Sequence, residues 1–199
     1  AQRLGARAAV FHLGDSHTAA DLYTDHLRLS LQRRFGDRGH GWLHPGRAWK
    51  TYFPRHTTVA SSKGWSTELG ILVSARALRG PFALGGVTVR STRRGDSLTI
   101  RPEDDGKATP RFGLLDVFYL NEAGGGSFHV DVDGETVAHV ETETGGGIGP
   151  GVEHLELVDA PHEVRIIADD DRGVALFGLA LERDVPGVVY DSVGINGAR

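Results

Sequence analysis

Residues 127–142, SFHVDVDGETVAHVET, carry the clearest structural pattern in this chain of 199 residues. In its first half the apolar side chains alternate with polar ones, as in a strand with one buried face: Phe128, Val130 and Val132. Asp133-Gly134 follows, a dipeptide that favours a two-residue hairpin turn, and a second run of alternating residues comes after it. The stretch therefore predicts two antiparallel strands that bury one face and expose the other.

Short runs of the same kind continue on both sides, from about residue 57 to residue 182. They include GVTVRST, DSLTIRP, LLDVFYL, HLELVD, HEVRIIAD and VALFGLALE. Turn residues separate these runs, and none of them has the period of a helix. Glycine supplies many of the turns, since it makes up 28 of 199 residues against a norm of ~7%. Seven or eight strands at this spacing predict a β-sandwich of jelly-roll type.

Both ends of the chain have a different pattern of apolar and polar residues. Residues 8 to 13 are apolar on both faces, which is typical of a strand inside a parallel sheet. Near the other end, Val188 to Tyr190 predict a second parallel strand that leads into a Gly/Asn-rich loop. From Thr18 onward apolar residues recur at helical spacing, which predicts an amphipathic helix: Ala20, Tyr23, Leu27, Leu31 and Phe35. The fold class is mixed α/β with β predominant, an α/β fold interrupted by a sandwich.

Four residues, GDSH from Gly14 to His17, connect the first strand to the helix. A serine here lies where backbone N–H groups converge, and each such donor can lower a barrier by about 3 kcal/mol when it binds an oxyanion. Gly14 would permit a sharp turn, and Asp15 could hydrogen-bond the neighbouring backbone. His17 could contact a substrate or satisfy a loop carbonyl. The residues alone leave two interpretations of Ser16 open, a nucleophile or the N-cap of the helix.

The stretch FHLGDSHTAADLYTDHLRLSLQRRFGDRGHGW resembles the first signature block of the SGNH, or GDSL-type, hydrolases. Its GDSH variant is similar to the peptidoglycan O-acetylesterase branch, whose members carry an inserted sandwich similar to a carbohydrate-binding module. VVYDSVGINGA, after the β-rich segment, resembles the second block. The resemblance implies a partial SGNH (flavodoxin-like) fold in residues 1–55 and 185–199, interrupted by a sandwich in residues 56–184.

This resemblance implies a serine carbohydrate esterase that removes O-acetyl groups from peptidoglycan or another cell-envelope polysaccharide, in the periplasm or outside the cell. Ser16 would attack the acetyl carbonyl, and the N–H groups of Ser16 and Gly197 would bind the oxyanion, supported by Gly14, Asp15 and His17. The family's last block, an Asp-x-x-His that holds the general base, is absent from these residues. Without that base a serine stays protonated, so the missing C-terminal part of the SGNH domain is an expected partner.

Two other function classes fit the same residues. One is a carbohydrate-binding module that retains the flanks of a catalytic domain. The other is a polysaccharide O-acetyltransferase, in which a sugar hydroxyl resolves the acyl-enzyme. Aromatic rings stack on sugars, so Trp49 and Tyr52 are candidate substrate contacts. The alternative is that the aromatic group packs between the domains: Trp42, Trp49, Tyr52 and Trp65.

Composition argues against several partners and cofactors. The net charge of −4 does not favour a nucleic acid, and no apolar run is long enough to span a membrane. The chain has no cysteine, and its ten histidines form no H-x-x-x-H pair on a helix, so no metal or other cofactor is predicted. Two Asp-x-x-His sequences match the missing block in spacing. The one at residues 37–40 directly follows the helix and the one at residues 159–162 lies in a turn of the sandwich, so neither is expected to be a catalytic pair.

Overall fold

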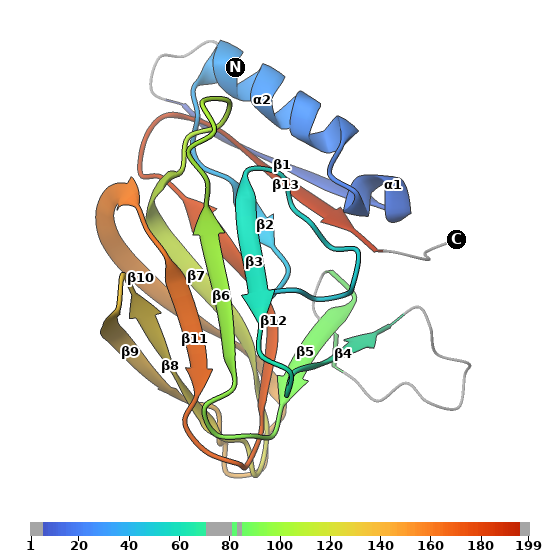
Figure 1. The fold of residues 1–199 in the computed structure, drawn as a ribbon, viewed down its shortest axis with the longest axis vertical. Helices are drawn as coiled ribbons and strands as arrows, with labels where there is room; N and C mark the ends of the chain where they lie inside the picture. The colour runs from blue at the N-terminus through green and yellow to red at the C-terminus, as the bar shows by residue number, and fades with distance from the viewer. Residues whose placement is uncertain (1–5, 71–80, 83–84, 196–199) are drawn as a thin grey trace.

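A computed structural model describes residues 6–70, 81–82 and 85–195 of the chain. Two stacked antiparallel sheets make up most of it, and a two-stranded parallel sheet with two helices lies at one end (Figure 1). The elements are β1 (Arg7–Gly14), α1 (Ser16–Ala19), α2 (Tyr23–Phe35), β2 (Gly41–Leu43), β3 (Thr57–Ser61), β4 (Ser66–Leu69), β5 (Val87–Ser91), β6 (Ser97–Pro102), β7 (Arg111–Asn121), β8 (Ser127–Val132), β9 (Glu135–Glu141), β10 (Gly149–Pro161), β11 (Val164–Ala168), β12 (Val174–Glu182) and β13 (Gly187–Gly194).

The two antiparallel sheets confirm the predicted β-sandwich. One has the order β10-β7-β12-β5-β4, with β2 also paired to β12, and the other has the order β3-β6-β11-β8-β9. None of the described residues between 57 and 182 is helical, as the alternating runs predict. The short strands β2, β3 and β4 were not among the predicted runs.

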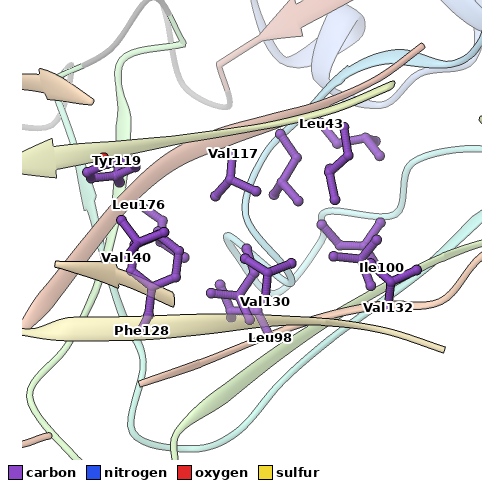
Figure 2. Packing of buried hydrophobic residues seen from close by; sticks show 14 of the residues in the cluster. Leu43, Leu98, Ile100, Val117, Tyr119, Phe128, Val130, Val132, Val140 and Leu176 are labelled. Atoms are coloured by element: carbon purple, nitrogen blue, oxygen red, sulfur yellow. The ribbon is translucent and has the colours of Figure 1, made fainter. Parts of the chain in front are cut away.

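Side chains from the facing sides of the two sheets form the main hydrophobic core. Val117, Tyr119 and Leu176 extend from one sheet toward Phe128 and Val130 of the other (Figure 2). All five are at most 9% exposed. Burial of apolar surface on this scale is the main force that holds two sheets face to face.

The hairpin between β8 and β9 has the predicted two-residue turn. Asp133 and Gly134 both have positive φ, 54° and 89°, as this turn type requires. The three apolar residues of β8 are buried in the core. His129 and Asp131, which alternate with them, lie on the outer face of the sheet.

The two ends of the described chain meet in the predicted parallel pair of β1 and β13, but within the described residues β1 is not inside a sheet: it pairs on one edge only, and none of its residues is buried. Gly14 at the end of β1 lies opposite Gly194 at the end of β13, so the whole sandwich lies between the two strands in sequence. β13 is joined to the sandwich through Asp191, whose side chain accepts a hydrogen bond of 2.8 Å from the backbone N–H of Trp42 in β2.

The predicted amphipathic helix forms, but in two pieces and with the opposite face buried. The break between α1 and α2 lies near Asp21, whose φ is 49°. On α2 the buried residues are polar: Thr24, Arg28 and Gln32. The apolar side chains of Tyr23, Leu27 and Phe35 are instead 41%, 41% and 39% exposed. The apolar face of this amphipathic helix therefore lies outward and its polar face lies inward.

Paired charges and hydrogen bonds satisfy the polar groups beneath α2. Arg28 Nη2 lies 3.0 Å from Asp21 Oδ2 and 2.8 Å from Asp25 Oδ1. Burial disfavours the charge on Asp21, but the Arg28 guanidinium outweighs it and holds the pKa of that carboxyl below its usual value. Gln32 Nε2 donates to the carbonyl of Gly39 at 2.7 Å. A polar helix face can pack inward here because each buried group has a partner.

Candidate active site

α1 packs directly over the ends of β1 and β13. A Cβ on Gly14 would lie 2.0 Å from Thr18 Oγ1, and a Cβ on Gly194 would lie 2.0 Å from the backbone nitrogen of Ala19. Both positions favour glycine because the second half of α1 lies against them: the Thr18 side chain over Gly14 and the backbone of Ala19 over Gly194. Gly14 ends β1 and is not among the described glycines with positive φ, so the contact with Thr18, and not a positive φ, favours glycine there. This packing places Ser16, the first residue of α1, at the edge of the parallel pair.

Asp15, and not Ser16, caps α1. Its Oδ1 accepts a hydrogen bond of 2.9 Å from the backbone N–H of His17. The interpretation of Ser16 as the N-cap is therefore wrong. Ser16 is exposed, and its hydroxyl makes no hydrogen bond with any other residue that the structure describes. The hydroxyl is left available for a ligand or a reaction.

The Asp15 carboxylate also lies beside the ring of His17, with Nδ1 at 3.3 Å from Oδ1. The backbone N–H of His17 is the main cause that keeps the pKa of Asp15 below its usual value, and the His17 ring adds to it. The His17 ring therefore lies beside a carboxylate and not beside a loop carbonyl, which was one of its two expected partners. Because its side chain is 84% exposed, contact between His17 and a substrate stays a prediction.

A series of hydrogen bonds ties both helices to both strands of the parallel pair. Thr18 Oγ1 lies 2.5 Å from Tyr23 Oη, which lies 3.2 Å from His12 Nε2. On the other side of that ring, His12 Nδ1 lies 2.5 Å from Tyr190 Oη. Burial raises the pKa of Tyr190, so its phenol keeps its proton and can donate to His12. The series fixes α1, and with it Ser16, relative to the strands.

A partly buried histidine, His40, and a fully buried one, His44, line a small pocket beneath α1. Burial lowers the pKa of His40 to about 3, with a further contribution from the charge on Arg28, and burial lowers the pKa of His44 to about 4. His44 Nε2 lies 3.3 Å from the carbonyl oxygen of Gly194. A neutral His44 can therefore donate to the end of β13 and hold it in place.

These histidines predict a loss of stability in mild acid. Both have folded-state pKa values below their ordinary 6.5, so the unfolded chain binds protons that the folded chain excludes. Their contribution is complete above pH 6.5 and falls by about 1.4 kcal/mol per pH unit for each histidine as the pH drops toward 4. Urea unfolding at a series of pH values measures this slope. A His44→Gln variant should show a shallower slope, and an unchanged slope would contradict the prediction.

The aromatic residues considered as sugar contacts pack largely inside the protein. Tyr52 is 6% exposed, and its hydroxyl accepts a hydrogen bond of 3.0 Å from the backbone N–H of His44. Trp42 is 8% exposed and covers Gly178, where a Cβ would lie 2.2 Å from the indole ring. Trp49 is half-buried, with its ring centroid 4.8 Å from that of Tyr52. Tyr52 is a core residue and offers no accessible platform, while a sugar contact by Trp49 stays a prediction.

In both Asp-x-x-His sequences the aspartate and the histidine have other partners. His40 is partly buried, and its Nε2 lies 3.3 Å from the carbonyl oxygen of Arg55. His162 Nδ1 lies 2.6 Å from Asp133 Oδ2, whereas Asp159 pairs with an arginine. Neither sequence forms an aspartate–histidine pair beside Ser16.

Gly197, the predicted second oxyanion donor, lies outside the described residues. Ile195 is described, and its backbone N–H donates to the carbonyl of Gly14 at 3.0 Å. The chain has therefore reached the same strand end as GDSH by residue 195.

No protein-family model and no curated protein matches this sequence. Among solved structures, the chain has a distant likeness to a β-1,3-glucan binding CBM6 from Bacillus halodurans, with a TM-score of 0.45 and 12% identity over 74% of this chain and 98% of that one. A CBM35 from Paenibacillus barcinonensis gives a TM-score of 0.40 and 14% identity over 63% and 91%.

A stronger likeness connects the chain to a solved structure described as "Peptidoglycan O-acetylesterase in action, 5 min". The TM-score is 0.66 and the identity is 27%. The match covers 98% of this chain and 49% of that one, so this chain spans about half the length of that protein. The likeness extends over the helical end, which carries Ser16, as well as the sandwich.

Proposed function

We propose that this chain is part of an SGNH-type serine esterase that removes O-acetyl groups from peptidoglycan or another cell-envelope polysaccharide. The observation that carries the proposal is the position of the Ser16 hydroxyl over the ends of two parallel strands. It is exposed, and it is not used to cap the helix. The likeness to a peptidoglycan O-acetylesterase over 98% of the chain supports it.

In the proposed reaction Ser16 Oγ gives its proton to the general base and attacks the acetyl carbonyl carbon, and the sugar oxygen leaves with that proton. Water then hydrolyses the acetyl-enzyme and releases acetate. The backbone N–H groups of Ser16 and Gly197 bind the oxyanion. Asp15 occupies the N–H of His17 and so fixes the start of α1, and Gly14 allows the close packing of that helix. This mechanism uses no metal or cofactor.

Apolar surfaces beside the site support the presence of a further packed segment that supplies the base. Phe11 and Leu13 on β1 are 46% and 60% exposed, and Leu27 and Phe35 on α2 are 41% and 39% exposed. β1 has a strand partner on only one edge within the described residues. Exposed apolar side chains beside an open strand edge are typical of a surface that another segment covers. We assign to that segment the Asp-x-x-His of the family's last block.

We further propose that residues 1–55 and 185–199 belong to one SGNH unit and that residues 56–184 are the inserted sandwich. The parallel pairing of β1 with β13 supports this division, because it brings the two outer segments together. The sandwich would position an acetylated glycan, with Trp49 as a candidate contact. No described helix has the length and apolar character needed to cross a membrane. A substrate in the cell envelope places the enzyme in the periplasm or outside the cell.

The full-length protein and O-acetylated peptidoglycan provide the test of this proposal. We expect free acetate to be released and to be measurable in the supernatant. Transfer of acetyl groups to an added acceptor glycan, without free acetate, would identify an O-acetyltransferase instead. Retention of the glycan with neither product would identify a carbohydrate-binding module.

A Gly194→Ala substitution is expected to reduce the rate of ester hydrolysis, although the proposed nucleophile, Ser16, is not itself replaced. The new Cβ would lie 2.0 Å from the backbone nitrogen of Ala19, so α1 must move and carry Ser16 with it. A displacement of about 1 Å can lower a rate by about 10²-fold. The rate with p-nitrophenyl acetate measures the effect in the full-length protein. Gly149→Ala is the matched control, since a Cβ there meets no atom within 4 Å, and equal rates for the two variants would contradict the prediction.

A further inference from the structure

Two histidines and an aspartate meet on the outer face of the sandwich. His129 lies on β8, His139 lies on β9, and Asp169 directly follows β11. The three strands are neighbours in the order β11-β8-β9 of one sheet (Figure 1). The three residues lie on the sandwich, whereas the candidate active site lies on β1, α1 and β13.

A β-bulge brings the two histidines opposite each other. The two-residue turn pairs Val132 with Glu135, and a regular ladder from that turn would place residue 138 opposite His129. The register instead shifts by one residue at Val137, so His139 becomes the partner of His129. Because side chains alternate along a strand, this shift turns His139 to the outer face. The ring centroids of the two histidines are 5.6 Å apart.

The candidate ligand atoms of this cluster are already close together. They all lie within 4.8 Å of one another. His129 Nδ1 lies 2.5 Å from Asp169 Oδ1, and His139 Nδ1 lies 3.8 Å from Asp169 Oδ2. A tetrahedral ion with bonds of about 2.0–2.2 Å separates its ligand atoms by about 3.3 Å, which lies between these two distances. Small side-chain rotations suffice to accommodate an ion.

The surroundings of the cluster favour a stable and accessible site. Beneath it, Phe128 and Val130 are 0% exposed and anchor β8 in the core. The side chains of His129, His139 and Asp169 are 22%, 75% and 27% exposed, so an ion can enter from solvent and keep a coordination position open. A rigid backbone with partly open ligands is the arrangement that a preformed metal site requires.

A carboxylate lies near the ring nitrogen of His129 that must carry the proton when a metal is bound. When Nδ1 binds an ion, the ring proton must sit on Nε2. Asp131 Oδ1 lies 3.8 Å from that Nε2. A carboxylate that accepts the second N–H of a metal-bound histidine is a common feature of such sites.

We propose that His129, His139 and Asp169 bind a divalent transition-metal cation of the Zn²⁺ type. Two imidazole nitrogens and one carboxylate are donors that suit Zn²⁺, whereas Ca²⁺ and Mg²⁺ prefer oxygen ligands alone. The ion replaces the hydrogen bond between His129 and Asp169, and the proton of that bond moves to Nε2 of His129. The site does not depend on Ser16 or on the proposed esterase activity.

Titration of the chain with Zn²⁺ alone, followed by calorimetry, tests the proposal. We expect saturable binding of one ion, and at least about a tenfold loss of affinity in His139→Ala, which removes one of three ligands. His139 is largely exposed, and circular dichroism checks that the variant stays folded. Co²⁺ provides a second readout, since its visible absorption reports tetrahedral coordination.

His154→Ala is the matched control. His154 Nδ1 lies 2.5 Å from Asp116 Oδ1, the same kind of pair as His129 with Asp169, but within the described part of the chain His154 belongs to no cluster of three candidate metal ligands. We expect the His154→Ala variant to bind Zn²⁺ as the unmodified chain does. Absence of saturable binding, or equal affinity in the His139→Ala variant and the unmodified chain, would overturn the proposal.

Discussion

Replacing Ser16 with alanine is expected to lower the rate of acetyl-ester hydrolysis by the full-length protein by at least about 10³-fold. The change removes the atom that forms the acetyl-enzyme, while the oxyanion donors and substrate contacts remain. The Ser16 hydroxyl makes no hydrogen bond with other described residues, so the substitution should leave the fold intact. Initial rates with p-nitrophenyl acetate measure the loss, and thermal unfolding checks the fold.

Ser30→Ala is the matched control for this prediction. Ser30 is also an exposed helical serine, but it lies on α2. Its substitution should leave the hydrolysis rate unchanged. Hydrolysis by the Ser16→Ala variant at the rate of the unmodified protein would show that Ser16 is not the nucleophile.

The largest expected loss of stability follows the substitution Arg28→Ala. Arg28 is 2% exposed and pairs with Asp21 and Asp25, so alanine leaves both carboxylates without their buried partner. Breaking a buried ion pair by removing one member costs about 3–5 kcal/mol. Total stabilities are only about 5–15 kcal/mol, so the variant should unfold at a much lower urea concentration.

Arg33→Ala on the same helix provides the control. Arg33 is exposed, and substitutions of exposed residues usually change stability by no more than about 0.5 kcal/mol. Urea unfolding of the two variants compares a buried and an exposed arginine directly. Equal midpoints would mean that the charges beneath α2 do not hold the helix in place.

The sandwich was predictable from the sequence because its strands carry strong local signals. In β8 the apolar residues face the core and the turn at Asp133-Gly134 has the required positive φ, so pattern and structure agree. The orientation of α2 was not predictable from its own pattern. Its apolar residues lie on the outer side, and its inner side is stabilised by the pairing of Arg28 with Asp21, just before the helix, and by the hydrogen bonds from Gln32 to the carbonyls of Gly39 and Val188.

The candidate site was predictable only in part, because it depends on contacts between distant segments. GDSH and the strand that precedes it are visible in the sequence, whereas the contact between Gly194 and α1 depends on the register of β1 and β13. The bond between His12 and Tyr190 depends on the same register. Likewise, His139 lies beside His129 only because of a bulge, which the alternating pattern does not reveal.

The burial of Tyr52 also lies beyond what an isolated sequence shows. Aromatic residues near a predicted site suggest sugar contacts, but the backbone N–H of His44 donates to the Tyr52 hydroxyl inside the protein. Burial then raises the pKa of Tyr52, which keeps the phenol neutral. A polar group at the end of an apolar ring is as well suited to such an internal bond as to a ligand.

Trapping of the acetyl-enzyme tests the central claim most directly. The full-length protein is mixed with p-nitrophenyl acetate, quenched in acid during turnover, digested and analysed by mass spectrometry. We predict one acetyl group on the peptide that contains Ser16, and no such group in the Ser16→Ala variant. Turnover with the acetyl group on a different residue, or with no acetylated peptide at all, would contradict the account.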